Sequence, residues 1–268
     1  YKTTPEEITQ HLKEATNDSE GFSIIKYGVG FHSPMPFEVP NFFMGEPRPG
    51  PPHLNKGLLT EEGFQHCVKC VEAMVTALDG KAQLALDCGP GWALSDAVRF
   101  AKELERLPIL WLEDMLTGDR SNHVGVAEYK ELTQATTTPI HTGEQIYLRN
   151  GFRELIASRA VRVIGPDPMD VGGLAELKWV AEFADLYGVQ IAPHGVFNGV
   201  LGMAAMTQVC ATMPENLIAF EYCKPPTEWW FDIVDCLPDQ LVVDGHIKVW
   251  DAPGTVSYTH LTLPTTKQ

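Results

Sequence analysis

Short apolar runs alternate with helical patterns along most of the chain, and this alternation constrains the fold more than any other feature. Each run ends in a polar break, and most lead into a helix-type pattern. Strands that alternate with helices form parallel β-α-β units, and seven consecutive units fit a closed barrel of about 250 residues. We therefore predict an α/β fold, a TIM-type (β/α)7β barrel. The expected strands cover residues 22–26, 84–87, 109–113, 139–144, 161–167, 189–194 and 217–221.

The helical patterns and the two ends of the chain define the expected domains. Because the first helical pattern precedes the first visible strand, we expect the first barrel strand to lie upstream of Tyr1. We assign residues 1–238 to the barrel and residues 239–253 to a hairpin, signalled by Asp244–Gly245, that needs another sheet. Residues 254–268 resemble a translated cloning adapter and are expected to be non-native. The clearest helices cover residues 5–15, 60–78, 94–105, 173–188 and 199–212.

Composition bears on partners and on the cellular compartment. The net charge of −15 opposes binding to nucleic acid and to anionic membrane surfaces. No apolar run reaches the roughly 18 residues of a membrane span, and no signal peptide is visible. Cys67 and Cys70 lie in a helical pattern without a second such pair, so we interpret them as helix cysteines in a reducing cytoplasm. We expect a cytoplasmic homo-oligomer.

Ionisable residues stand at the end of every expected strand. In a parallel barrel all strands end at the same face, which is where barrel active sites are built. Side chains far apart in the sequence should therefore converge in one mouth. They are Lys26, Asp87, Glu113, Glu144, Asp167, His194 and Glu221.

Three of these residues predict a metal site. Asp87, Glu113 and Glu144 end three successive strands and offer hard oxygen ligands. Carboxylates crowded together raise one another's pKa unless a cation compensates, and carboxylate ligation suits Mg²⁺. The alternative for any one acid is a rim residue paired with an arginine or a helix N-terminus. Three in succession at the same phase favour the metal.

Histidines supply the expected acid–base chemistry. Asp167 and His194 end adjacent strands, and an aspartate beside a histidine fixes its tautomer and raises its basicity. His194 taken alone would equally fit a hydrogen-bonded structural histidine. His32, in a long loop over residues 29–57, is either a second acid that contacts substrate or an ordinary loop histidine. For His141, packing and substrate contact both remain open.

The ordered set of motifs resembles the enolase superfamily over about residues 1 to 253. The likeness is greatest to the mandelate racemase/muconate lactonizing enzyme-like branch and its acid-sugar dehydratases. It implies a barrel whose N-terminal α+β capping domain is missing from this sequence, and the hairpin would pair with that cap. The motifs are Asp87, WLED with Glu113, HTGEQ with Glu144, PDPMDVGG with Asp167 and APHG with His194.

The resemblance also implies a role for each site residue. The three acids would hold one Mg²⁺ per subunit, and His194 with Asp167 would form the acid–base dyad. Glu221 would contact an oxygen of the bound carboxylate or enolate. Lys26 matches the first lysine of a K-x-K motif and would stabilise the enediolate. The second position of that motif is Gly28, which favours a dehydratase over a two-base racemase.

The function implied is a Mg²⁺-dependent hydro-lyase acting on a small carboxylate, a sugar acid such as a galactonate-like aldonate. It would abstract the proton α to the carboxylate and eliminate the β-hydroxyl to give a 2-keto-3-deoxy acid. Two alternatives remain. One is a racemase or epimerase of a 2-hydroxy acid, and the other is a catalytically inert metal-binding barrel fragment.

Overall fold

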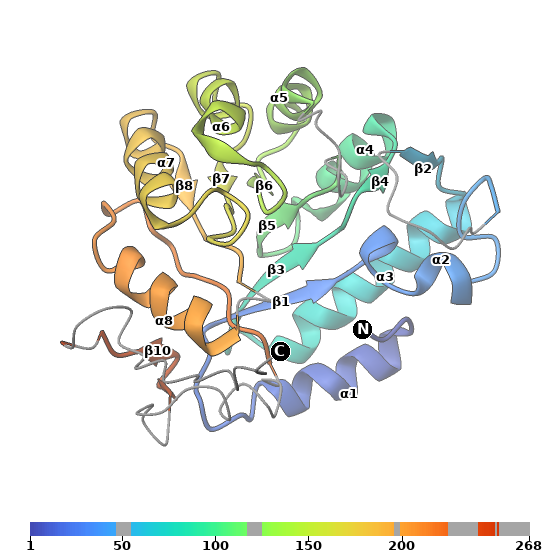
Figure 1. Ribbon diagram of the computed structural model, residues 1–268. Coiled ribbons are helices and arrows are strands. Elements are labelled where there is room, and N and C mark those ends of the chain that lie inside the picture. Colours follow the sequence, from blue (N-terminus) through green and yellow to red (C-terminus); the bar gives the residue numbers. More distant parts are fainter. Residues whose placement is uncertain (47–54, 117–124, 196–198, 225–240, 250, 252–268) are drawn as a thin grey trace, which may run out of the picture.

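The computed structural model describes residues 1–46, 55–116, 125–195, 199–224, 241–249 and 251. Its centre is a parallel sheet of six strands in the order β1-β3-β5-β6-β7-β8. The strands of this sheet therefore lie side by side in the order in which they occur along the chain. The sheet curls, with the helices on its outer side, as Figure 1 shows. This arrangement confirms the predicted α/β barrel architecture. The strands are β1 Ile24–Gly28, β3 Gln83–Asp87, β5 Ile109–Glu113, β6 Ile140–Thr142, β7 Val163–Ile164 and β8 Gln190–Ile191.

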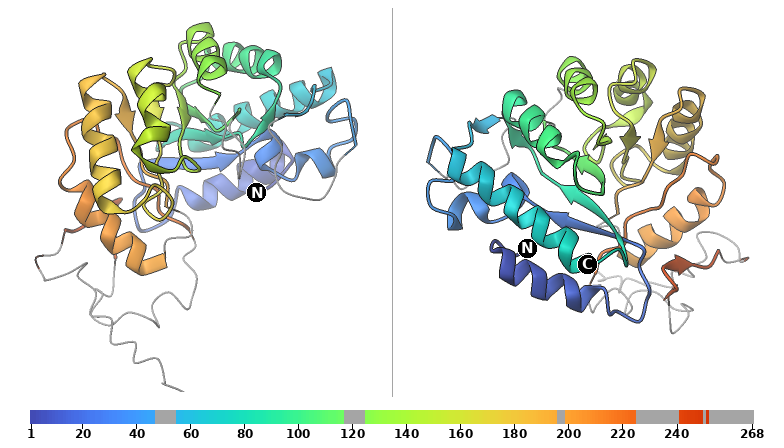
Figure 2. Two further views of the ribbon diagram at one scale, coloured as in Figure 1. Left: turned by 45° about the horizontal axis from the view of Figure 1, so that its top comes forward. Right: turned by 180° about the vertical axis from the view of Figure 1, so that it is seen from behind.

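The helices form where apolar periodicity and capping residues specify them. Thr4 and Thr60 cap the first two long helices, each accepting a backbone N–H with its side chain. All five predicted helices are present, with ends within two residues of those expected. Figure 2 shows α1 and α3 side by side against one flank of the curled sheet. The long helices are α1 Pro5–Ala15, α3 Glu61–Leu78, α4 Leu94–Leu104, α5 Val126–Ala135, α6 Leu148–Ala157, α7 Leu174–Leu186 and α8 Gly199–Cys210.

Alternation along the strands separates two cores and positions the site. In β3, Leu84 and Leu86 belong to the large core between the sheet and the helices, whereas Ala85 belongs to a small inner core. Trp111 on β5 joins the same inner core. Since side chains two residues apart share a face of a strand, the next inward positions are Asp87 on β3 and its counterpart on β5. The acids that end these strands therefore lie directly above the inner core.

Some predicted strands are shorter than expected, and one is reduced to a bridge. Strands β6, β7 and β8 end two or three residues before the expected ends because Gly143, Pro166 and Pro193 interrupt the ladder. In the described part of the chain, the expected strand 217–221 pairs only through a parallel bridge between Ile191 and Leu217. It still follows β8, since its backbone N–H groups bond to Ile191 and Pro193 carbonyls.

The region predicted as one long loop, 29–57, contains short regular elements, so that prediction was wrong for part of it. A 3₁₀ turn, η1, spans Gly30–His32 and a helical turn, α2, spans Met35–Glu38. Strand β2, Asn55–Gly57, pairs in parallel with β4, Gly91–Trp92. Residues 47–54 lie outside the described part of the chain. The loop is therefore tied to the segment after β3 rather than free over its whole length.

The predicted hairpin is confirmed. Strands β9, Val242–Val243, and β10, His246–Ile247, pair antiparallel. Asp244 and Gly245 between them have φ of 50° and 72°, which is the pair of positive φ values that a tight type I′ turn needs. The Gly245 N–H donates to the Glu20 carbonyl, so the hairpin packs beside the turn after α1. The expected non-native segment, 254–268, lies outside the described residues.

The two cysteines that were predicted to lie in a helix do so. Cys67 and Cys70 are free thiols buried on α3, and burial raises the pKa of Cys70 to about 12. They are therefore core residues of a helix, as predicted. Across the described ranges, no helix combines the length and apolar composition needed to cross a bilayer.

Candidate active site

Three carboxylates meet at the carboxyl ends of the strands. Asp87 and Glu113 are the last residues of β3 and β5, and Glu144 follows β6 by two residues. One carboxylate oxygen from each lies within 4.8 Å of those of the other two. Asp87 and Glu113 are buried, while Glu144 is half-buried at the open side. The three residues predicted to ligate a metal thus form one compact group of hard oxygen donors.

Lys26 lies at the centre of this acidic group. Its Nζ is 2.6 Å from Glu113 Oε1, 2.9 Å from Glu221 Oε1 and 3.5 Å from Asp87 Oδ2. Burial alone would lower the pKa of Lys26, but these carboxylates outweigh burial and hold it well above its usual range. Lys26 is therefore a permanent cation that touches three of the predicted site residues.

The surroundings shift the pKa values of Glu113 and Asp87 in opposite directions. Burial would raise the pKa of Glu113, but contact with Lys26 and the nearby His141 bring it down to about 2. Burial holds the pKa of Asp87 well above its usual range, since Lys26 is 3.5 Å away and other carboxylates oppose ionisation. One lysine therefore does not compensate the group. A divalent cation such as Mg²⁺ would favour the ionised form of Asp87, and the three clustered oxygens fit such an ion.

The predicted dyad is also brought together. His194 Nδ1 lies 2.7 Å from Asp167 Oδ2, while its Nε2 faces Glu144 Oε2 at 3.2 Å and Glu221 Oε2 at 3.5 Å. Asp167 is itself fixed, because its Oδ1 accepts the Met169 N–H at 2.7 Å. Burial would lower the pKa of His194, but its bond to Asp167 and the two glutamates raise it to about 9. Asp167 thus holds Nδ1 of His194, while Nε2 faces Glu144 of the triad and Glu221.

The two remaining predicted histidines occupy different positions. His32 Nδ1 is 3.1 Å from Asp87 Oδ1, and its side chain is 34% exposed at the mouth. Burial is the main cause that lowers the pKa of His32 to about 4. His141 is 2% exposed and stacks on Trp111, with ring centroids 5.1 Å apart. His32 is within reach of a bound molecule, whereas His141 packs within the barrel beside Glu113.

The sequence analysis did not identify three residues at the site, namely Trp111, Asp114 and Tyr1. The Trp111 indole N–H donates to Glu113 Oε2 at 2.9 Å, and period-two alternation could have placed it on the same face. Asp114 is buried and accepts the Thr142 hydroxyl; its φ of 51° turns the chain after β5. The Tyr1 ring packs over Gly28, where an added Cβ would lie 2.7 Å from it. Only a three-dimensional contact reveals that last residue.

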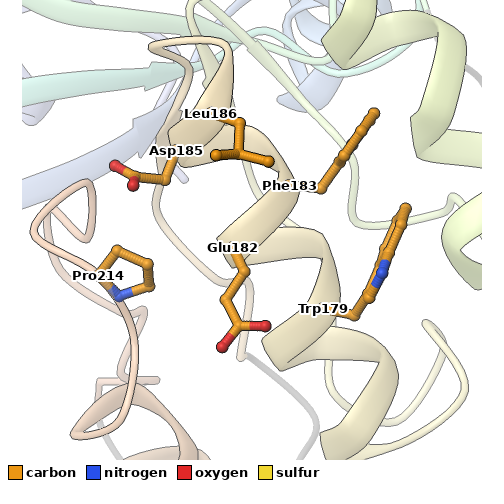
Figure 3. A pocket seen from close by; sticks show the side chains of 6 residues that line it. All are labelled: Trp179, Glu182, Phe183, Asp185, Leu186 and Pro214. Atoms are coloured by element: carbon orange, nitrogen blue, oxygen red, sulfur yellow. The ribbon is translucent and has the colours of Figure 1, made fainter.

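A separate hollow lies beside α7, and Figure 3 shows the side chains that line it. Its ionisable groups are the carboxylates of Glu182 and Asp185, neither of which belongs to the triad or the dyad. The acidic group, and not this hollow, is therefore the candidate active site. The hollow is lined by Trp179, Glu182, Phe183, Asp185, Leu186 and Pro214.

The fold is that of a known class of proteins. The chain belongs to the enolase C-terminal domain-like family, whose model matches residues 9–256. A mandelate racemase/muconate lactonizing enzyme-like protein from Rubrobacter xylanophilus superposes with a TM-score of 0.80 at 28% identity. The match covers 97% of this chain and 60% of that one. The resemblance drawn from the motifs is therefore confirmed.

Two of the relatives with assigned reactions are sugar-acid dehydratases. A D-xylonate dehydratase from Haloferax volcanii is 38% identical over 191 residues, 71% of this chain and 44% of its own length. A D-galactonate dehydratase from Variovorax paradoxus is 30% identical over 139 residues, 52% of this chain and 35% of its own length. The chain thus spans less than half the length of these two relatives.

Proposed function

We propose that this chain carries the catalytic site of a Mg²⁺-dependent acid-sugar dehydratase. The single observation that carries the proposal is the meeting of three clustered carboxylates with an Asp–His dyad in one barrel mouth. His194 Nε2 lies 3.2 Å from Glu144, so the base and the metal triad face the same small volume. Two relatives that share up to 38% identity are named as dehydratases of D-xylonate and D-galactonate, in line with this chemistry.

Asp87, Glu113 and Glu144 would hold the cation. When bound, Mg²⁺ supplies positive charge that stabilises developing negative charge on the substrate carboxylate. Lys26 adds a second fixed positive charge in the same volume, since its Nζ lies within 3.5 Å of Asp87, Glu113 and Glu221. Fixed charges aimed at the enediolate are the largest kind of catalytic contribution such a site can make. This assignment explains why strands of the inner core end on acids.

His194 would move the protons. Its Nε2 takes the proton from the carbon α to the carboxylate, the C–H electrons form the enediolate, and the same nitrogen returns a proton to the departing β-hydroxyl, which leaves as water. The resulting enol ketonises to a 2-keto-3-deoxy acid. The pKa of about 9 is partly due to Glu144, and a cation sharing that carboxylate removes this cause. His194 is then a better matched base near neutral pH.

The residue at position 28 argues against a two-base racemase. Gly28 stands where the second lysine of the K-x-K motif would be, and the Tyr1 ring fills the space beside it. A phenol is a poor base at neutral pH because its ordinary pKa is about 10. A dehydratase that uses His194 for both proton transfers needs no such base. We therefore favour elimination over racemisation or epimerisation.

The assay is production of 2-keto acid from an aldonate panel that starts with D-xylonate and D-galactonate, with Mg²⁺ and with EDTA. We expect turnover that requires Mg²⁺. His194→Asn keeps a polar group but removes the base, so turnover should fall by at least about 10³-fold while Mg²⁺ binding remains. Retained turnover in His194→Asn would refute the assignment. Exchange of the α-proton with deuterium without loss of water would instead identify a racemase or epimerase.

The organisation of the protein around this site is also proposed. We assign residues 1–238 to the catalytic barrel and 239–253 to a hairpin that pairs with a further domain. A small carboxylate is the expected partner, in a cytoplasmic homo-oligomer. Size-exclusion chromatography with light scattering measures the oligomeric state directly.

A further inference from the structure

His32 contacts the metal triad, yet the proposed reaction gives it no task. It is the last residue of η1, in the segment that leaves β1. Its Nδ1 lies 3.1 Å from Asp87 Oδ1, so a side chain from one barrel strand's loop reaches a carboxylate at the end of the next strand in the sheet. His32 is therefore placed to act on Asp87.

The two oxygens of Asp87 have different surroundings. Oδ1 accepts the Gly89 N–H at 3.1 Å and lies at the same distance from His32 Nδ1. Oδ2 faces Lys26 Nζ at 3.5 Å, on the side of the other acids. One oxygen is therefore held by the turn after β3 and by the imidazole, whereas the other is directed toward the centre of the acidic group.

Contacts with the segment after β3 hold the backbone of His32 in place independently of any bound molecule. The His32 N–H donates to the Cys88 carbonyl at 3.1 Å. Gly89 has φ of +58°, and a Cβ added there would lie 2.6 Å from His32 Cβ and 2.8 Å from its Cα. The η1 turn is thus docked directly against the end of β3, and only glycine fits at position 89.

We propose that His32 is a positioning residue for the metal site. Its Nδ1–H donates to Asp87 Oδ1 and thereby holds the carboxylate with Oδ2 turned toward the cation. This inference rests on the proposed metal-binding function of the triad. Groups that orient a metal ligand in this way typically change metal affinity by 10- to 100-fold when they are removed.

The test is the dissociation constant for Mg²⁺ and Mn²⁺, measured by calorimetry on the full chain with three His32 variants. His32→Leu removes both ring nitrogens, and His32→Gln carries its amide near the Nε2 position but no donor at Nδ1. Both should bind the ions at least about tenfold more weakly. His32→Asn places an amide N–H near the position of Nδ1 and should stay within about threefold of the wild type. His246→Leu, at an exposed hairpin histidine, is the matched control and should not change affinity.

The outcomes separate this inference from the proposed function. Equal affinity in the wild type and His32→Gln overturns the role of His32 while leaving the triad intact. Equal weakening in the Asn, Gln and Leu variants also overturns it, because packing rather than donation would then be responsible. A wild-type chain that binds neither ion overturns the metal triad itself. Circular dichroism in EDTA identifies folded variants, and the Asn–Gln comparison decides the matter if the Leu variant is unfolded.

Discussion

At the scale of single residues, Lys26 joins the parts of the site. It is 14% exposed and contacts carboxylates from β3, β5 and the segment after β8. Buried charges are costly unless they are paired, and here one cation faces several anions. Removing it leaves those anions facing one another without compensation.

Lys26→Met should therefore destabilise the metal-free protein by about 3 to 5 kcal/mol at pH 8, the usual cost of breaking a buried ion pair. The measurement is urea unfolding in EDTA. Mg²⁺ should raise the melting temperature of the variant by more than it raises that of the wild type. Lys178→Met, at an exposed lysine paired with Glu182, is the control and should change stability by less than about 0.5 kcal/mol. An unchanged free energy of unfolding in Lys26→Met would contradict this account.

His194 makes the stability of the metal-free protein depend on pH. Its pKa is about 9 in the folded chain and 6.5 ordinarily. A raised pKa means that the protonated ring stabilises the fold, so this stabilisation is fully present below pH 6.5 and is lost as the pH rises through 9. Unfolding in EDTA at pH 6, 7.5 and 9.5 should show stability falling across that window.

The His194→Asn variant isolates this contribution. Other raised groups, such as the Asp87 carboxyl, change the pH profile of both proteins alike. The difference between wild type and variant should therefore shrink from pH 6 to pH 9.5. A difference that stays constant over this range would show that His194 does not have a raised pKa.

At the scale of elements, the contact of α3 with the loop after β1 holds the mouth in place. Gly63 lies in the first turn of α3, and a Cβ added there would lie 1.9 Å from the Phe42 carbonyl oxygen. Because this oxygen belongs to the backbone, it cannot move aside as the end of a flexible side chain could. The segment that carries Phe42 also carries His32 at its start, so α3 indirectly supports the site.

Gly63→Ala should lower the free energy of unfolding by about 2 kcal/mol, because overpacking against backbone outweighs the better helix propensity of alanine. Chemical denaturation measures this change. Glu62→Ala, the exposed neighbour in the same turn, should stay within about 0.5 kcal/mol of the wild type. A Gly63→Ala variant as stable as the wild type would mean that α3 and the loop do not pack this closely.

Much of the element pattern and the candidate site could be predicted from local signals. Period-two alternation and the barrel rule place Asp87 and Glu113 on one face, and helix periodicity with Thr60 as a cap locates α3. The position of His32 against Asp87 could not be predicted, since it depends on the close approach of backbone at Gly89. Contacts between distant segments have no periodic signal in the sequence.

The element ends were less predictable for a related reason. An apolar run shows which residues are buried but not where the hydrogen-bond ladder stops. The run at 217–221 is apolar and lies beside β8, yet it keeps only one bridge in the described chain. The β2–β4 pair went unnoticed because each partner is only two or three residues long.

At the scale of the whole molecule, the fold brings acids from distant parts of the chain to one end of a curled sheet. The inner core of Ala85, Trp111, Val163 and Ala192 fills the barrel below them and excludes water from that side. Charges that meet above an apolar core interact strongly, which favours both a bound cation and a perturbed histidine. The barrel architecture thus produces the strong electrostatic interactions within the site.

The most direct test is an anomalous diffraction map of a crystal soaked in Mn²⁺, which replaces Mg²⁺ in oxygen sites and can be located by its own signal. The account predicts one strong peak per chain about 2.0 to 2.4 Å from an oxygen of each of Asp87, Glu113 and Glu144, with His194 on the adjacent wall. A fully soaked crystal with no peak among these three carboxylates, or with the peak at other residues, would contradict it.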